Sequence, residues 1–160
     1  MACRSFANGL AVAAVCALAT VADAQTPPTQ APYRPGLGDL MTNTVQPRHI
    51  KLWAGGAQRN WAYAAYELHE LEEAFERAGR AWPKWRSYQV PEMIDALTKP
   101  PLGALDAAIK AADPTRFAAA FAELTEACNA CHKAADRGVI VIRVPEAAGF
   151  PDQDFRPANP

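Results

Sequence analysis

Hydrophobic residues recur at steps of three and four over most of the chain, which is the period of an amphipathic α-helix. The clearest segment runs from Gln58 to Gly79, and the residues of its apolar stripe are Trp61, Ala64, Ala65, Leu68, Leu71 and Phe75. A strand-like pattern is confined to the β-branched run Val139–Ile142. The pattern therefore predicts an all-α protein.

A second clear helix begins at Asp113-Pro114, where an aspartate can cap the first turn and a proline suits the first helical position. Its apolar face, spaced by 4, 3, 4 and 3 residues, consists of Phe117, Phe121, Leu124, Cys128 and Cys131. Gly138 is a plausible end for this helix. The two cysteines thus share the face that is expected to point into a core.

The other helices are less regular. Leu102–Ala112 has a helical apolar pattern after Pro100-Pro101, and a short turn is possible at Glu92–Leu97. Leu37–Ala54 is also apolar at helical spacing, but it contains Pro47, which predicts a bent helix or two short pieces. Together the segments predict a four-helix bundle, an architecture that can hold a cofactor in its core.

Both ends of the chain differ from this helical region. Residues 1–24 have a short positive start, an apolar run and a small-residue pattern, which predicts a signal peptide cleaved after Ala24 and export to the periplasm. Residues 25–36 are rich in proline and predict a disordered linker. The folded bundle is then expected at residues 37–137, followed by an extended tail, residues 138–160, that packs on it.

Composition limits the possible functions. The chain has 160 residues with 16 basic and 17 acidic side chains, a formal net charge of −1, and no polybasic run. Nucleic acid is therefore not an expected partner. After the signal, no apolar stretch is long enough to insert into a membrane. Paired carboxylates in an apolar setting and glycine-rich phosphate loops are also missing from the sequence, so we do not expect an enzyme.

The most informative motif is Cys128-Asn129-Ala130-Cys131-His132. This Cys-x-x-Cys-His spacing is that of a c-type haem attachment site, in which two thiols bond to the haem vinyl groups and the histidine binds the iron. On a helix, Cys128 and Cys131 lie about 60° apart and Cys128 and His132 about 40° apart, so all three share one face. The rival interpretations are a disulfide, which would constrain little within one turn, and a zinc site, for which further ligands are scarce.

The segment Pro100–Ala135, with its apolar helix, its Asp-Pro joint and its C-terminal haem motif, resembles the class II cytochromes c, the four-helix-bundle relatives of cytochrome c prime. The resemblance implies one covalently attached haem c at Cys128 and Cys131, with His132 as the proximal ligand of the iron. Two features depart from the family pattern: Pro47 interrupts the first helix, and the chain continues well beyond the last one.

The distal position on the iron decides between an electron carrier and a gas-binding haem. The low-spin members of the family place a methionine of the first helix there, and Met41 matches that position. Met41 is therefore the first choice and His49 the alternative, with an open site or His69 behind them. A methionine among apolar residues is also a common core residue, and a lone histidine is more often a surface residue.

Three functions remain open at this stage. We expect a periplasmic monohaem cytochrome that carries single electrons between periplasmic redox proteins, and it could form a homodimer. The alternatives are a five-coordinate haem module that binds or senses nitric oxide or carbon monoxide, and a haemless metal or thiol-redox protein that uses the two cysteines.

Arg48 and Lys51 are candidates to pair with haem propionates. The apolar run Val139–Val144 is expected to cover either the haem edge, with Arg143 near a propionate, or a more distant part of the bundle.

Overall fold

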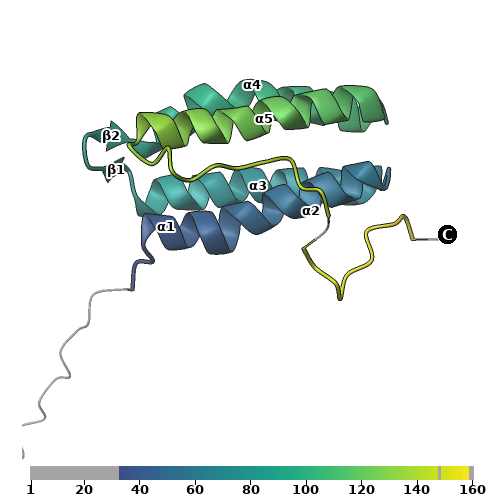
Figure 1. Cartoon of the computed structure of the whole chain (residues 1–160), viewed down its shortest axis with the longest axis horizontal. Helices are drawn as coiled ribbons and strands as arrows, with labels where there is room; N and C mark the ends of the chain where they lie inside the picture. The colour runs from purple at the N-terminus through teal and green to yellow at the C-terminus, as the bar shows by residue number, and fades with distance from the viewer. Residues whose placement is uncertain (1–32, 148, 159–160) are drawn as a thin grey trace, which may run out of the picture. The chain divides into compact units, whose positions relative to one another are not determined.

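The computed structural model describes residues 33–147 and 149–158, so the expected signal peptide and most of the expected linker lie outside the described residues. Within them the chain is an all-α helical bundle (Figure 1). The helices are α1 (Leu37–Leu40), a π-helical turn η1 (Met41–Val45), α2 (Gln46–Ala57), α3 (Trp61–Ala81), α4 (Val90–Lys110) and α5 (Pro114–Ala134). None of the described helices is long and apolar enough to cross a membrane.

The first arm of the bundle stays helical through Pro47, so the chain does not break into two separate pieces there. Gln46 has helical backbone angles, and its N–H donates to the carbonyl of Met41, five residues back. Pro47 has no N–H and its ring crowds the preceding turn of a regular α-helix. The wider π-helical turn η1 comes directly before the proline, and it lets the helix continue. Such turns are frequent at functional sites.

Two helices begin as the capping pattern predicts. The side chain of Asp113 accepts hydrogen bonds from the N–H groups of Thr115 and Arg116, which confirms the predicted start of α5. Asn60 caps α3 by accepting from the N–H of Tyr63. The capped first turns fix where each long helix begins.

The helix α4 is longer than the sequence indicates. Pro100 and Pro101 lie inside it instead of preceding it, so the expected short turn and the expected third helix form one rod of 21 residues. The buried side chains Ile94, Thr98, Pro101 and Leu105 keep steps of 4, 3 and 4 across the proline pair. Continuous burial of this face outweighs the lost backbone hydrogen bonds.

The four long arms pack as a cycle, in which α2 contacts α3, α3 contacts α4, α4 contacts α5 and α5 contacts α2. The end of the bundle that holds the α2–α3 and α4–α5 connections is filled with aromatic rings. Trp53, Trp61 and Phe121 all contact the ring of Phe117, or one another, at centroid distances of 5.0–6.1 Å. Gly56 lies against the ring of Phe117, and a Cβ atom there would overlap it.

The opposite end carries a small antiparallel hairpin, β1 (Lys84–Trp85) and β2 (Tyr88–Gln89), which the sequence pattern does not predict (Figure 1). The strand-like run Val139–Ile142, in contrast, forms no strand.

Before α1, the described end of the expected linker is held on the bundle: the guanidinium of Arg34 lies 3.8 Å from the centre of the Trp82 ring, and Trp82 Nε1 donates to the carbonyl of Pro35. Disorder therefore does not extend to these residues.

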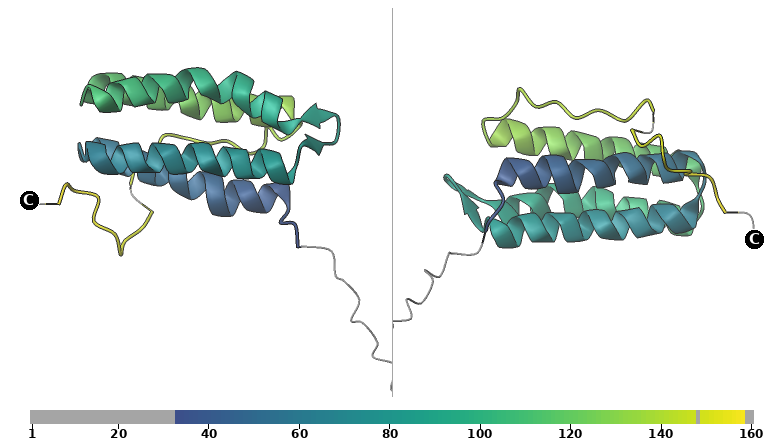
Figure 2. Two further views of the ribbon diagram at one scale, coloured as in Figure 1. Left: turned by 180° about the vertical axis from the view of Figure 1, so that it is seen from behind. Right: turned by 90° about the horizontal axis from the view of Figure 1, so that it is seen from below.

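After α5, the described tail has no regular secondary structure and runs along the α2–α5 face of the bundle (Figures 1 and 2). Its first part is bound to α5 by two hydrogen bonds between the Asn129 side chain and the backbone of Ile142. Its last part reaches the start of α3, where Phe155 is buried and contacts the ring of Tyr63. The tail thus touches both ends of the bundle.

A candidate cofactor site at the hairpin end of the bundle

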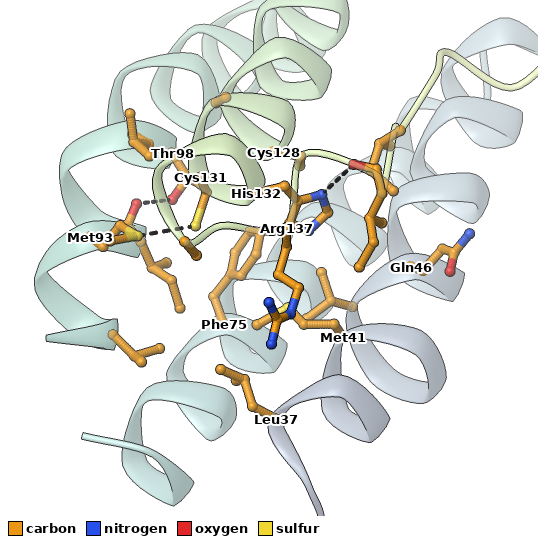
Figure 3. A pocket seen from close by; sticks show the side chains of 18 of the residues that line it. Leu37, Met41, Gln46, Phe75, Met93, Thr98, Cys128, Cys131, His132 and Arg137 are labelled. Atoms are coloured by element: carbon orange, nitrogen blue, oxygen red, sulfur yellow. Dashed lines mark hydrogen bonds between the residues drawn. The ribbon is translucent and has the colours of Figure 1, made fainter. Parts of the chain in front are cut away.

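A cavity of about 240 Å³ lies between the helices at the hairpin end (Figure 3). Small-molecule sites usually have volumes of roughly 300–1,000 Å³, so this cavity is slightly smaller than that range. The apolar part of its wall comes from every arm of the bundle and from the tail, and includes Leu37, Val45, Phe75, Val90, Ile94, Leu97, Ala127, Ile140 and Ile142.

The side chains of Cys128, Cys131 and His132 all line this cavity from α5 (Figure 3). They continue the face on which Phe117, Phe121 and Leu124 are buried, as the helical spacing predicts. Both thiols are free and half-buried. The structure therefore brings the three residues of the motif together on one wall of a cavity.

The ring of His132 is fixed by the tail. Its Nδ1 lies 3.0 Å from the carbonyl oxygen of Ile140 (Figure 3). A carbonyl can only accept a hydrogen bond, so Nδ1 carries the proton, and in that tautomer the lone pair of Nε2 is free to bind a metal. A histidine that ligates iron or zinc is commonly held in this way.

Met41 and His49 line the same cavity from the first arm of the bundle. Met41 begins the π-helical turn η1 and is partly buried. His49 is only 4% exposed, and its Nε2 lies 3.0 Å from Oγ1 of Thr125. Because the Thr125 hydroxyl donates to the carbonyl of Phe121, it accepts from His49, which therefore carries its proton on Nε2. Burial lowers the pKa of His49 to about 4, so the ring is neutral.

Several cavity residues were not found from the sequence. Met93 on α4 accepts a hydrogen bond from the thiol of Cys131 at a sulfur–sulfur distance of 3.4 Å. Trp85 and Tyr88 of the hairpin and Arg137 after α5 also line the cavity. Among the described lining residues, Arg137 alone is a lysine, arginine or carboxylate. The aromatic pair Trp85 and Tyr88 around a short polar turn was the available signal for the hairpin, and a positive residue shortly after the motif was the signal for Arg137.

The hairpin is tied to the end of α5. The guanidinium of Arg137 lies 5.0 Å from the centre of the Trp85 ring, and the hydroxyl of Tyr88 donates to Asp136 at 3.4 Å. These contacts place both aromatic rings of the hairpin and one cation on the wall of the cavity. The contacts also explain why Arg137 points across the cavity in Figure 3.

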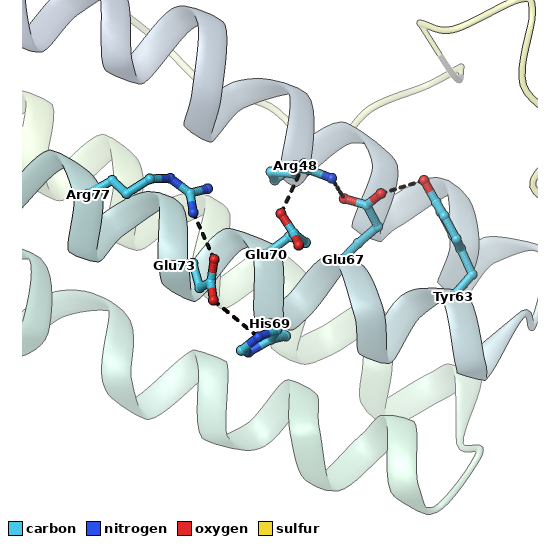
Figure 4. A network of polar contacts seen from close by, with 7 residues as sticks. All are labelled: Arg48, Tyr63, Glu67, His69, Glu70, Glu73 and Arg77. Carbon is cyan, nitrogen blue, oxygen red and sulfur yellow. Dashed lines mark hydrogen bonds and ion pairs between the residues drawn. The ribbon is translucent and has the colours of Figure 1, made fainter. Parts of the chain in front are cut away.

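The structure does not place the other sequence candidates at the cavity. His69 is 65% exposed and pairs with Glu73, so it is excluded as a ligand of a group bound there. Arg48 donates to the buried carboxylate of Glu67 and to Glu70 (Figure 4). Arg48 is therefore held in this network of ion pairs, away from the cavity.

Lys51 and Arg143, the other two basic residues expected near haem propionates, also lie away from the cavity. Lys51 lies 4.6 Å from the centre of the Phe150 ring. Arg143 is 81% exposed and faces Glu146. Arg137 takes the position at the cavity that the sequence analysis gave to Arg143, because the chain turns at Asp136-Arg137 before the tail begins.

The two thiols have an environment unlike that of reactive cysteines. Burial, and then the neighbouring thiol of Cys131, raises the pKa of Cys128 to about 11. Burial also raises the pKa of Cys131. Such thiols are protonated at neutral pH, whereas reactive cysteines lie in electropositive surroundings that lower the pKa. Within the described residues, no three histidine, cysteine or acidic side chains are arranged to hold a metal ion by themselves.

Comparisons with known proteins add no relative: no protein-family model, curated protein or solved structure matches this chain. The function must therefore be argued from the motif and from the geometry of the cavity.

Proposed function

We propose that this protein is a periplasmic monohaem cytochrome of the class II type that carries single electrons between redox proteins. One haem c would be attached to Cys128 and Cys131, with His132 as the proximal ligand. When bound, the haem iron supplies one-electron chemistry by cycling between its ferric and ferrous states. The partners would be periplasmic redox proteins, and the protein could act as a homodimer.

One observation carries the proposal. The residues of the Cys-x-x-Cys-His motif line a largely apolar cavity of about 240 Å³ from a single helix, and the imidazole has its Nε2 lone pair free. A disulfide or a thiol-redox centre has no need of such a cavity. A covalent haem needs two thiols on one helix face, a ligand beside them and apolar walls.

The donor set on the other wall favours Met41 as the distal ligand. His49 already uses Nε2 in a buried hydrogen bond to Thr125, so it could bind iron only through Nδ1 or after breaking that bond. Met41 has a thioether at the cavity wall and belongs to a π-helical turn. Arg137, at the same cavity, is the side chain that would pair with a haem propionate.

The first prediction is covalent haem. Full-length protein produced together with a haem c attachment system should gain the mass of one haem and keep its colour after acid-acetone extraction, because thioether bonds survive that treatment. Cys128→Ser with Cys131→Ser should yield folded protein without covalent haem. As a matched control, Ala130→Ser, at an exposed position in the same motif, should leave attachment intact.

The contrary result is equally clear. Wild-type protein that stays colourless, with two titratable thiols and a native circular dichroism spectrum, would end the haem proposal and favour the haemless alternative. Coloured protein whose oxidised spectrum shows a five-coordinate iron would keep the haem and change the function to gas binding.

A further inference from the structure

We infer that Asn129 is a positioning residue for the haem ligand: it clamps the C-terminal tail so that the carbonyl of Ile140 accepts the Nδ1 proton of His132. The inference rests on the proposed function, because it concerns how the imidazole would bind iron. Asn129 is an interior residue of the Cys-x-x-Cys-His motif, and neither thiol chemistry nor ligation requires an asparagine there.

The clamp has the hydrogen-bonding pattern of a strand neighbour. Asn129 Oδ1 accepts from the N–H of Ile142 at 2.8 Å, and Asn129 Nδ2 donates to the carbonyl of Ile142 at 3.0 Å. The side chain is buried, with 8% of its surface exposed. Both polar groups of the side-chain amide thus pair with both backbone polar groups of one residue, which fixes the position of Ile142 on α5.

The segment before Ile142 is fixed at its other end as well. The N–H of Ile140 donates to the carbonyl of Arg137 at 2.8 Å, and the N–H of Arg137 donates to the carbonyl of His132 at 2.7 Å. Residues 137–142 are therefore a short loop that leaves α5 at the histidine and is pinned back at Asn129. The carbonyl of Ile140 lies between these two points, 3.0 Å from His132 Nδ1.

This hydrogen bond has a chemical consequence for the ligand. A carbonyl that accepts the Nδ1 proton fixes the tautomer and the ring orientation, and it increases the electron donation of Nε2. A more basic imidazole stabilises ferric over ferrous iron and lowers the midpoint potential. The tail would then tune the potential through Asn129 without itself touching the iron.

The experiment compares holoproteins. Asn129→Ala removes both bonds of the clamp. Ile142→Pro removes the N–H that donates to Asn129 and leaves the Ile142 carbonyl in place, and Ile142→Ala serves as its control because it keeps the backbone bonds and also shortens the side chain. Val139→Ala is the control for the tail, since this side chain is 89% exposed and does not line the cavity.

We expect Asn129→Ala and Ile142→Pro to raise the midpoint potential relative to their controls. In the reduced holoprotein they should also speed exchange of the His132 Nδ1 proton, measured by NMR, by about tenfold, the factor that corresponds to one ordinary hydrogen bond. If both variants lose only stability, with unchanged potential and unchanged proton exchange, Asn129 is a brace for the tail and the inference is overturned. A wild-type protein that accepts no haem would overturn the proposed function, and this inference with it.

Discussion

Two histidines of this molecule have ring nitrogens whose roles are set by their hydrogen-bond partners. His132 gives its Nδ1 proton to a backbone carbonyl and leaves Nε2 free, whereas His49 gives its Nε2 proton to Thr125 and leaves Nδ1 free. The more accessible Nε2 is therefore available only on the histidine of the motif. This difference distinguishes His132, the proposed ligand, from the buried His49, although both rings line one cavity.

The distal ligand can be tested residue by residue. If Met41 binds the iron, the oxidised protein should show the weak near-infrared sulfur-to-iron band of His/Met haems, and Met41→Ala should abolish it and allow carbon monoxide to bind. His49→Ala should keep the band, because it removes a neighbour and not the ligand. The opposite pair of results, in which only the His49 variant changes the spectrum, would assign the distal position to His49.

Burial of His49 also predicts a pH dependence of folding. Its pKa is about 4 in the folded protein against an ordinary value of 6.5, so the unfolded chain takes up the proton first as the pH falls. The contribution to stability is complete above the ordinary value and is lost towards the folded value, by about 2 kcal/mol between pH 7 and pH 5. Denaturant unfolding of wild-type and His49→Gln at both values measures it. An equal loss in both proteins would show that His49 is not the group responsible.

Single residues were predictable where the chemistry is local. The motif and its helix face follow from spacing alone, and so does the Asp113 cap. The roles of Arg137 and Met93 could not be predicted, because the turn after α5 and the helical register through Pro100-Pro101 place them at the cavity. Arg143 was the wrong choice for the same reason: the side chain that reaches the site depends on where the chain turns.

At the scale of elements, prolines are poor guides to helix ends in this chain. Pro100-Pro101 suggested a helix boundary and lie inside α4, whereas Pro47 suggested a bend or a break and follows the π-helical turn η1 without breaking the helix. In a helix interior, proline is less favourable than alanine by about 3 kcal/mol. The π-helical turn η1 relieves the clash at Pro47, and continuous apolar burial holds α4 together, so tertiary packing overrides the local signal.

A glycine pair tests how closely the elements pack. Gly56 near the end of α2 lies against Phe117 of α5, whereas Gly103 in α4 is exposed with open space around its Cα. Gly56→Ala should therefore destabilise the protein by about 1–3 kcal/mol through overpacking. Gly103→Ala should stabilise it by about 0.5–1 kcal/mol, the helix preference of alanine over glycine. Thermal unfolding gives both values, and a stabilising Gly56→Ala would mean that α2 and α5 are not packed as described.

The two ends of the bundle differ in how their interiors are filled. One end is filled by the aromatic cluster around Phe117, and the other end encloses the cavity. His49 lies at the junction, with its ring 4.4 Å from that of Phe121. The filled end supplies a core that does not depend on a cofactor. At the other end the side chains leave a cavity between the helices, and this end carries the Cys-x-x-Cys-His motif.

The tail spans both ends, so its two halves should have separable effects. Ile140 and Ile142 line the cavity, whereas Gln153 donates to the Tyr63 hydroxyl at 2.7 Å and Phe155 is buried beside it. Tyr63 is 12 residues from the cavity residue Phe75 along α3, which is about 18 Å of helix. The sequence analysis held haem shielding and distant bracing as alternatives, and the tail contacts the cavity with its first half and the start of α3 with its second half.

Two truncations test this division. A chain ending at Val144 keeps the Asn129 clamp and loses the distal anchor, so it should unfold more easily but retain the midpoint potential and the ligand kinetics of the full-length holoprotein. A chain ending at Gly138 also removes Ile140 and Ile142, so it should in addition shift the potential upward and react faster with carbon monoxide, because burial and hydrogen bonding tune such sites. If the Val144 truncation already produces the full shift, the distal anchor and not Asn129 holds the tail over the cavity. Equal potentials in all three proteins would limit the tail to a structural role.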